Sequence, residues 1–227
     1  MKNIGHKRLS EFTEEDFISA VETYVTTCAY PKYFVEVSRV SQDDEHYLGY
    51  DGVLTTLVPF YIQFKRSTFH TPQFQGRVVK DRQNFGFSNQ NGFFSFTLHR
   101  DRNSKRYEQH NALFTLSQHA KAAYVAPLFY KKTKLSELKA YYSEYPWDYA
   151  NVTIIETDLH QKPFIFRNCR IFHDSITVPP HKTINDHLGN HEYTFSFAGD
   201  ICFHSKAEVV NVPRNTLYDL IRSVIEE

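Results

Sequence analysis

Four polar side chains within the first 65 residues have types and spacings that suit chemistry on a phosphate: Glu14, Asp51, Gln63 and Lys65. Carboxylate and amide oxygens are ligands that suit Mg²⁺, which keeps several waters and bridges to phosphates. A lysine beside such a cation can orient or activate a water and stabilise developing negative charge. The set therefore indicates a hard-cation site next to a lysine.

Regular structure would bring these four side chains to one place. Gln63 and Lys65 are two residues apart in a strand expected at 60–65, so both point to one face of a sheet. Asp51 lies at a strand-breaking Asp-Gly pair in the strand before it. Glu14 precedes three apolar residues of a helix at the spacing of its buried stripe: Phe17, Ile18 and Val21.

The order Glu14, Asp51, Gln63, Lys65 resembles that of the PD-(D/E)xK nuclease superfamily. Its restriction-endonuclease-like fold has a core of a helix, a three-stranded meander, a helix and a strand. The chain resembles the variant in which glutamine, here Gln63, replaces the second acidic ligand, and Tyr50 stands in place of the nominal proline. The resemblance implies that Asp51, Gln63 and Glu14 hold Mg²⁺ or Mn²⁺ and that Lys65 assists the attacking water.

The periodicity of the chain predicts an α/β protein with this order of elements. Thr13 is a natural N-cap for the first helix, and the stretch 67–91 is interpreted as an insertion or a long loop. The core of about residues 13–130 is expected to contain a helix from 13, a polar turn at 41–45, strands at 33–40, 47–57, 60–65 and 92–99, a helix at 107–123 and a strand at 123–130.

Residues 131–227 are expected to form a mixed α/β C-terminal extension of the same single domain, 1–227. The pattern predicts a short helix at 135–142, strands at 152–157, 163–171 and 192–197, and a last helix at 216–225 with Asn215 as its N-cap. This half is rich in aromatic residues, which could form the interface of a homodimer or of a complex with another protein.

The net charge of zero hides a gradient along the chain. Residues 1–60 carry −5, residues 61–110 carry +6 and residues 111–227 carry −1. A basic stretch permits contact with phosphates, although a solvated loop face has the same composition. If the stretch guides nucleic acid to the site, the side chains expected to do so are Arg66, Arg77, Lys80, Arg82, Arg100 and Arg102.

Several classes of protein are disfavoured by composition. The N-terminus lacks the apolar core of a signal peptide, and no apolar run approaches the length of a membrane span. Three scattered cysteines do not make a disulfide framework, so a reducing cytoplasm is the simplest location and no membrane partner is expected. Nucleotide-binding loops and the nucleophile motif of serine hydrolases are also missing from the sequence.

The sequence leaves three functions open. The first is a Mg²⁺-dependent nuclease that hydrolyses phosphodiester bonds in DNA, in defence or in DNA processing. The second is a catalytically silent nucleic-acid-binding or partner-interaction protein on a nuclease-like fold, and the third is a subunit that cleaves only with a partner. The presence of Asp51 and Lys65 together favours the enzyme.

Overall fold

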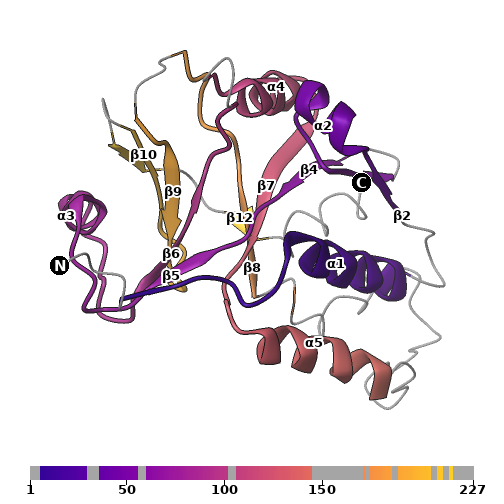
Figure 1. The fold of residues 1–227 in the computed structure, drawn as a ribbon, viewed down its shortest axis with the longest axis horizontal. Helices are drawn as coiled ribbons and strands as arrows, with labels where there is room; N and C mark the ends of the chain where they lie inside the picture. Colours follow the sequence, from indigo (N-terminus) through magenta and orange to yellow (C-terminus); the bar gives the residue numbers. More distant parts are fainter. Residues whose placement is uncertain are drawn as a thin grey trace, which may run out of the picture.

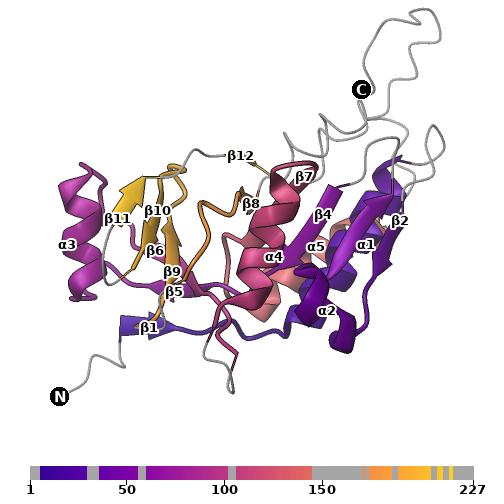
Figure 2. The same cartoon turned by 90° about the horizontal axis from the view of Figure 1, so that it is seen from above.

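The computed structural model describes residues 6–29, 36–55, 60–101, 106–144, 171, 174–185, 189–205, 209–211 and 215–216. These residues form a mixed α/β fold built on two six-stranded sheets (Figures 1 and 2). No helix in these ranges is long and apolar enough to cross a membrane.

One sheet carries the predicted site residues and has helices on both of its faces. Its strand order is β12-β8-β7-β4-β3-β2, and β2, β3 and β4 form an antiparallel meander while β7 runs parallel to β4. The strands are β2 (Glu36–Arg39), β3 (Gly52–Thr55), β4 (Phe60–Phe64), β7 (Lys121–Pro127), β8 (Ser175–Val178) and β12 (Asn215–Thr216). Figure 1 shows α1 (Glu14–Ala29) and α5 (Lys132–Glu144) on one side, and α2 (Gln42–Leu48) and α4 (Glu108–Ser117) on the other.

The other sheet has the order β1-β5-β6-β9-β10-β11, with α3 (Arg77–Asn84) beside it (Figure 2). Its strands are β1 (Lys7–Arg8), β5 (Thr68–His70), β6 (Phe93–Thr97), β9 (Glu192–Phe195), β10 (Ile201–His204) and β11 (Val209–Asn211). The chain beyond residue 131 therefore contributes strands to both sheets. It completes the two sheets and is not simply appended to the core.

An aromatic core joins the two sheets. Phe96 of β6 lies 5.4 Å, between ring centroids, from Tyr124 of β7 and 5.3 Å from Tyr193 of β9. Phe195 and Phe203 are fully buried in the same cluster. These aromatic residues of the second half are therefore used inside the molecule, where each large ring contributes substantial apolar burial.

The first helix begins as its sequence predicts. The Thr13 hydroxyl accepts a hydrogen bond from the Asp16 N–H at 3.0 Å, and the Asp16 carboxylate accepts one from the Thr13 N–H at 2.9 Å. This reciprocal cap satisfies two backbone donors at the helix start. Phe17 then packs edge-on against Phe64 of β4, with ring centroids 5.9 Å apart, so α1 covers the apolar face of that strand.

Several predicted elements differ in the structure. The polar turn at 41–45 is part of α2, and the strand expected at 47–57 begins only at Gly52, because α2 continues to Leu48. The stretch 67–91 contains β5 and α3, so it is not simply a long loop. Asn215 does not cap a helix but begins β12, which pairs with β8. The strands expected at 152–157 and 163–171 lie outside the described residues, except for Ile171, which is helical.

Gly49 allows α2 to pack closely on α4. Its φ of 81° is the left-handed helix-ending conformation, and a Cβ there would lie 2.6 Å from the backbone nitrogen of Leu113. A side chain would therefore meet both backbone strain and a clash with rigid helix backbone.

We expect Gly49→Ala to lower the free energy of unfolding by about 2 kcal/mol or more, measured by urea denaturation. Gly86→Ala is the matched control, because Gly86 has a similar φ of 77° but nothing within 4 Å of the added carbon. It should lose only the cost of the backbone conformation, about 1 kcal/mol. Equal losses in the two variants would show that the contact between α2 and α4 is not tight.

Candidate functional site

The meander places Asp51 against β4 through backbone hydrogen bonds. The Asp51 N–H donates to the Ile62 carbonyl at 2.8 Å, and the Phe64 N–H donates to the Asp51 carboxylate oxygen Oδ2 at 2.5 Å. One carboxylate oxygen is thus fixed by the strand. The other, Oδ1, is buried and has no hydrogen-bond partner among the described residues.

Gln63 lies on the same strand and is 1% exposed. Its Nε2 is also buried without a hydrogen-bond partner among the described residues. A buried polar group without a partner costs about 1–3 kcal/mol, so two such groups near each other need an explanation. The apolar neighbours Ile62 and Phe64 point to the opposite face, toward α1, as the alternation of the strand predicts.

Lys65 follows β4 and is half-buried. Its N–H donates to the Val125 carbonyl at 2.9 Å, and its Nζ lies 5.9 Å from the centroid of the Tyr124 ring. Tyr124 pairs with Gln63 across β7 and β4, so the two side chains share one face of the sheet. The structure therefore brings Gln63 and Lys65 to the face covered by α4.

A buried hydrogen-bonded chain supports the aromatic ring below Lys65. The Nε2 of His110 lies 2.7 Å from the Lys182 carbonyl, and its Nδ1 lies 2.6 Å from the Tyr124 hydroxyl. A carbonyl only accepts, so His110 carries its proton on Nε2 and Tyr124 donates to Nδ1. Burial, the largest cause, lowers the pKa of His110 to about 4, which keeps the ring neutral.

The pKa of Asp51 shows which charges surround it. This pKa is raised from 3.8 to about 8, chiefly by burial, while the positive charge of Lys65 opposes the rise. The negative charge of Glu45 also raises it, and the charge of Glu14 adds the smallest contribution. The charged side chains that act on the Asp51 carboxylate are therefore those of Lys65, Glu45 and Glu14.

Glu45 was missed in the sequence because 41–45 was interpreted as a turn. The signal that could have identified it is the sequence from Ser41 to Gly49. Ser41 accepts a hydrogen bond from the Asp44 N–H at 3.2 Å, and Gly49 ends the helix in the left-handed conformation. A serine N-cap and a glycine eight residues later are the start and stop signals of a short helix.

Three buried histidines and Asp51 predict how stability depends on pH in the absence of a divalent cation. Burial lowers the pKa values of His70, His110 and His204 to about 4, so the unfolded chain binds more protons below pH 6.5 and stability rises with pH up to there. Asp51 has the opposite sign, because the folded state keeps its proton up to about pH 8. Above pH 6.5 these histidines no longer contribute to the pH dependence of stability. Of these four groups, only Asp51 then makes the free energy of unfolding fall as the pH rises.

We therefore expect the free energy of unfolding in EDTA to fall by about 2 kcal/mol between pH 6.5 and 8. Asp51→Asn should remove this decline, as should saturating Mg²⁺, because a bound cation keeps the carboxylate ionised. Urea denaturation at three pH values measures it. A decline that persists unchanged in the Asn variant would show that Asp51 does not titrate in this range.

The basic residues predicted to guide nucleic acid do not form one group around this site. Arg77 and Lys80 are exposed on α3, which lies at the opposite end of the molecule from α2 in both views (Figures 1 and 2). Arg66 is exposed directly after Lys65, and Arg100 is half-buried ahead of α4. Arg102 lies outside the described residues.

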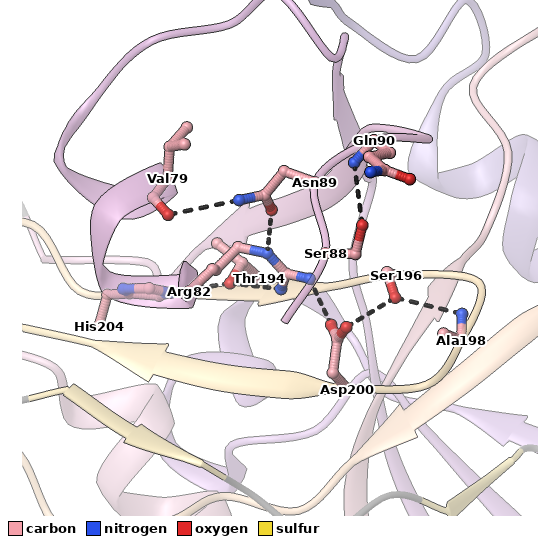
Figure 3. Close-up of polar contacts among 10 residues, drawn as sticks. All are labelled: Val79, Arg82, Ser88, Asn89, Gln90, Thr194, Ser196, Ala198, Asp200 and His204. Carbon is pink, nitrogen blue, oxygen red and sulfur yellow. Dashed lines mark hydrogen bonds and ion pairs between the residues drawn. The ribbon is translucent and has the colours of Figure 1, made fainter. Parts of the chain in front are cut away.

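Arg82 is buried, which excludes it from the basic residues predicted to guide nucleic acid. Its side chain has no exposed surface, and its guanidinium donates to Asp200 at 2.5 Å, Thr194 at 3.1 Å and Asn89 at 2.9 Å (Figure 3). Asp200 also accepts from the Ser196 hydroxyl. The prediction that Arg82 contacts phosphate is therefore replaced by a role in fixing α3 to the second sheet.

No group of three histidine, cysteine, aspartate or glutamate side chains that could hold a metal ion occurs among the described residues. Any cation at Asp51 would therefore rely on at most one further carboxylate, together with the Gln63 amide and water. Comparisons of the chain with models of protein families, with curated proteins and with solved structures found no match.

Proposed function

We propose that the protein is a Mg²⁺-dependent nuclease that hydrolyses phosphodiester bonds in DNA. The observation that carries the proposal is a pair of buried polar atoms without partners among the described residues, Asp51 Oδ1 and Gln63 Nε2, on the sheet face where the Lys65 ammonium lies over the Tyr124 ring. Such a pair suits a cation that both groups would bind.

The donor set fits Mg²⁺ chemically. Asp51 offers one anionic oxygen while its other oxygen stays bonded to the strand. The oxygen and nitrogen of a glutamine amide exchange places by a half-turn of the terminal bond, and their assignment follows from their partners. Since the described residues supply no partner for Nε2, Gln63 can present its oxygen to a cation. Mg²⁺ held there would polarise a phosphodiester and neutralise the charge that develops on it.

Lys65 supplies the positively charged group that the proposed hydrolysis needs beside the cation. Its three ammonium donors can orient the attacking water and stabilise the negative charge of the transition state. The Tyr124 ring lies beside this ammonium group, and the bond from Tyr124 to His110 fixes the ring. Water adds to phosphorus, the bond from phosphorus to the leaving oxygen breaks, and a proton reaches that oxygen.

The arrangement of elements gives independent support to the resemblance in the sequence. A helix, a three-stranded antiparallel meander, a helix and a strand parallel to the third occur in this order as α1, β2–β4, α4 and β7. This order supports a restriction-endonuclease-like core in which α2 interrupts the meander and β5, α3 and β6 are inserted before α4.

Nicking of supercoiled plasmid DNA tests the proposal. The purified full chain should convert supercoiled plasmid to open circles in Mg²⁺ or Mn²⁺ and should be inactive in EDTA. Gel-shift binding of DNA without nicking under any of these conditions would favour the alternative of a catalytically silent nucleic-acid-binding protein.

A further inference from the structure

A buried tyrosine ring lies under the Lys65 ammonium group. The ammonium nitrogen is 5.9 Å from the centroid of the Tyr124 ring, within the range of a cation–π interaction. Tyr124 is 1% exposed, and its ring packs against Phe96 and Tyr193 at centroid distances of 5.4 Å and 5.9 Å. Lysine carries its charge on a long, flexible stem, so this ring offers a fixed surface to a side chain that is otherwise free to turn.

His110 fixes the far end of the Tyr124 ring. The Tyr124 hydroxyl lies 2.6 Å from His110 Nδ1, the two rings are nearly parallel at 7°, and His110 is 2% exposed. His110 Nε2 faces the Lys182 carbonyl at 2.7 Å, so the other tautomer would place two acceptors together. It would also take away the acceptor that His110 provides for the buried Tyr124 hydrogen. The order of donors, from Tyr124 to His110 and from His110 to Lys182, is therefore fixed.

A segment from the second half of the chain holds His110 in place. Next to it on α4, the Asn111 amide donates to the Ile184 carbonyl at 3.0 Å and accepts from the Ile184 N–H at 2.8 Å. Ile184 is 4% exposed, and the Lys182 carbonyl that binds His110 lies two residues before it. The first turn of α4 thus connects Lys65 to the second half of the chain.

We propose that Tyr124 and His110 are positioning residues for Lys65: the Tyr124 ring holds the ammonium group in place, and His110 holds the ring. This inference rests on the proposed function, because it is there that Lys65 acts on the attacking water. Both residues are buried below Lys65, so their alteration should displace the ammonium group without removing it. A displaced catalytic group lowers the rate of the chemical step more than the affinity for substrate.

The kinetics of plasmid nicking in Mg²⁺ test this role. Tyr124→Phe keeps the ring but loses the bond to His110, and should lower kcat about tenfold, while His110→Leu should lower it about tenfold to a hundredfold. KM should change by less than about threefold in both variants. His110→Gln should bring kcat back to within about threefold of the unaltered protein, because one glutamine amide offers a donor to the Lys182 carbonyl and an acceptor to the Tyr124 hydroxyl.

A second measurement follows the position of Lys65 without any activity. The lysines of the full chain, free of metal and DNA, are dimethylated with isotope-labelled methyl groups, and Lys65→Arg identifies the Lys65 signals in the NMR spectrum. These signals should lie upfield of those from lysines that face no ring, because the Tyr124 ring shields groups above its face. His110→Leu should reduce this upfield shift. Lys7 is the internal control, since its ammonium lies 5.2 Å from the Phe74 ring centroid and its signals should not move.

Gly86→Ala controls for a general loss of stability. Gly86 follows α3, away from this site, and its φ of 77° makes alanine unfavourable there without any clash. This variant should nick plasmid at the rate of the unaltered protein.

The outcomes separate this inference from the proposed function. If Tyr124→Phe and His110→Leu nick at the full rate while Lys65→Ala is inactive, the positioning role is refuted and the nuclease proposal stands. A folded His110→Gln that is as slow as His110→Leu also refutes the role, as do Lys65 signals that coincide with those of exposed lysines in the unaltered protein. If the unaltered protein nicks no DNA in Mg²⁺ or Mn²⁺, the proposed function fails and the catalytic purpose of this pair fails with it.

Discussion

Asp51→Ala and Lys65→Ala are each expected to abolish plasmid nicking, a loss of about a thousandfold or more, but by different routes. Asp51 is the one predicted ligand that combines a carboxyl group with a buried oxygen for which the described residues supply no hydrogen-bond partner. Its removal should therefore eliminate Mn²⁺ binding as well. Lys65 acts on the water and the developing charge, so its removal should lower the rate while Mn²⁺ affinity changes little.

Nicking assays and titrations with Mn²⁺, run on the same preparations, separate these two effects. Lys131→Ala is the control for Lys65, because Lys131 is an exposed lysine outside the site. It should retain full activity. An Asp51→Ala variant that nicks plasmid normally would contradict the assignment of the site, and a binding function would then replace the nuclease proposal.

Arg82→Met is expected to cause the largest loss of stability, about 3–5 kcal/mol in the free energy of unfolding. The variant removes one partner of a buried ion pair and leaves the Asp200 carboxylate, whose side chain is 9% exposed, without its cation. It also removes the hydrogen bonds to Thr194 and Asn89 (Figure 3). Urea denaturation measures the change.

The matched control is Arg77→Met on the same helix. Arg77 is 61% exposed and its ion pair with Asp81 spans 3.5 Å at the surface, so its loss should cost less than about 0.5 kcal/mol. Adding Asp200→Asn to Arg82→Met should recover part of the stability, because the unpaired charge is removed. A loss below about 1 kcal/mol for Arg82→Met would show that the buried network does not hold α3 in place.

The parts of the fold that local patterns could predict are those whose signals are contiguous. The Thr13 cap, the alternation expected at 60–65 and the apolar strand expected at 123–130 each depend on one short segment, and the structure contains α1, β4 and β7 there. That Gln63 and Lys65 share one face of the sheet could be predicted from the alternation of side chains along a strand, which repeats every two residues.

Other features depend on contacts between distant segments and could not be predicted in this way. Arg82 has the sequence context of a surface helix, and its burial depends on Asp200, which is 118 residues away in the sequence. The pairing of β6 with β9 likewise joins segments on either side of β7 and β8. Glu45 was a different case, since its helix had capping signals that were present but were interpreted as a turn.

The most direct test of the account is a crystal of the protein soaked in Mn²⁺, with the ion located by its anomalous scattering. The account predicts one peak about 2.1 Å from Asp51 Oδ1 and from the side-chain oxygen of Gln63. A crystal at saturating Mn²⁺ with no peak at Asp51, or with Asp51 and Gln63 bonded only to protein or to water, would contradict the proposed metal site.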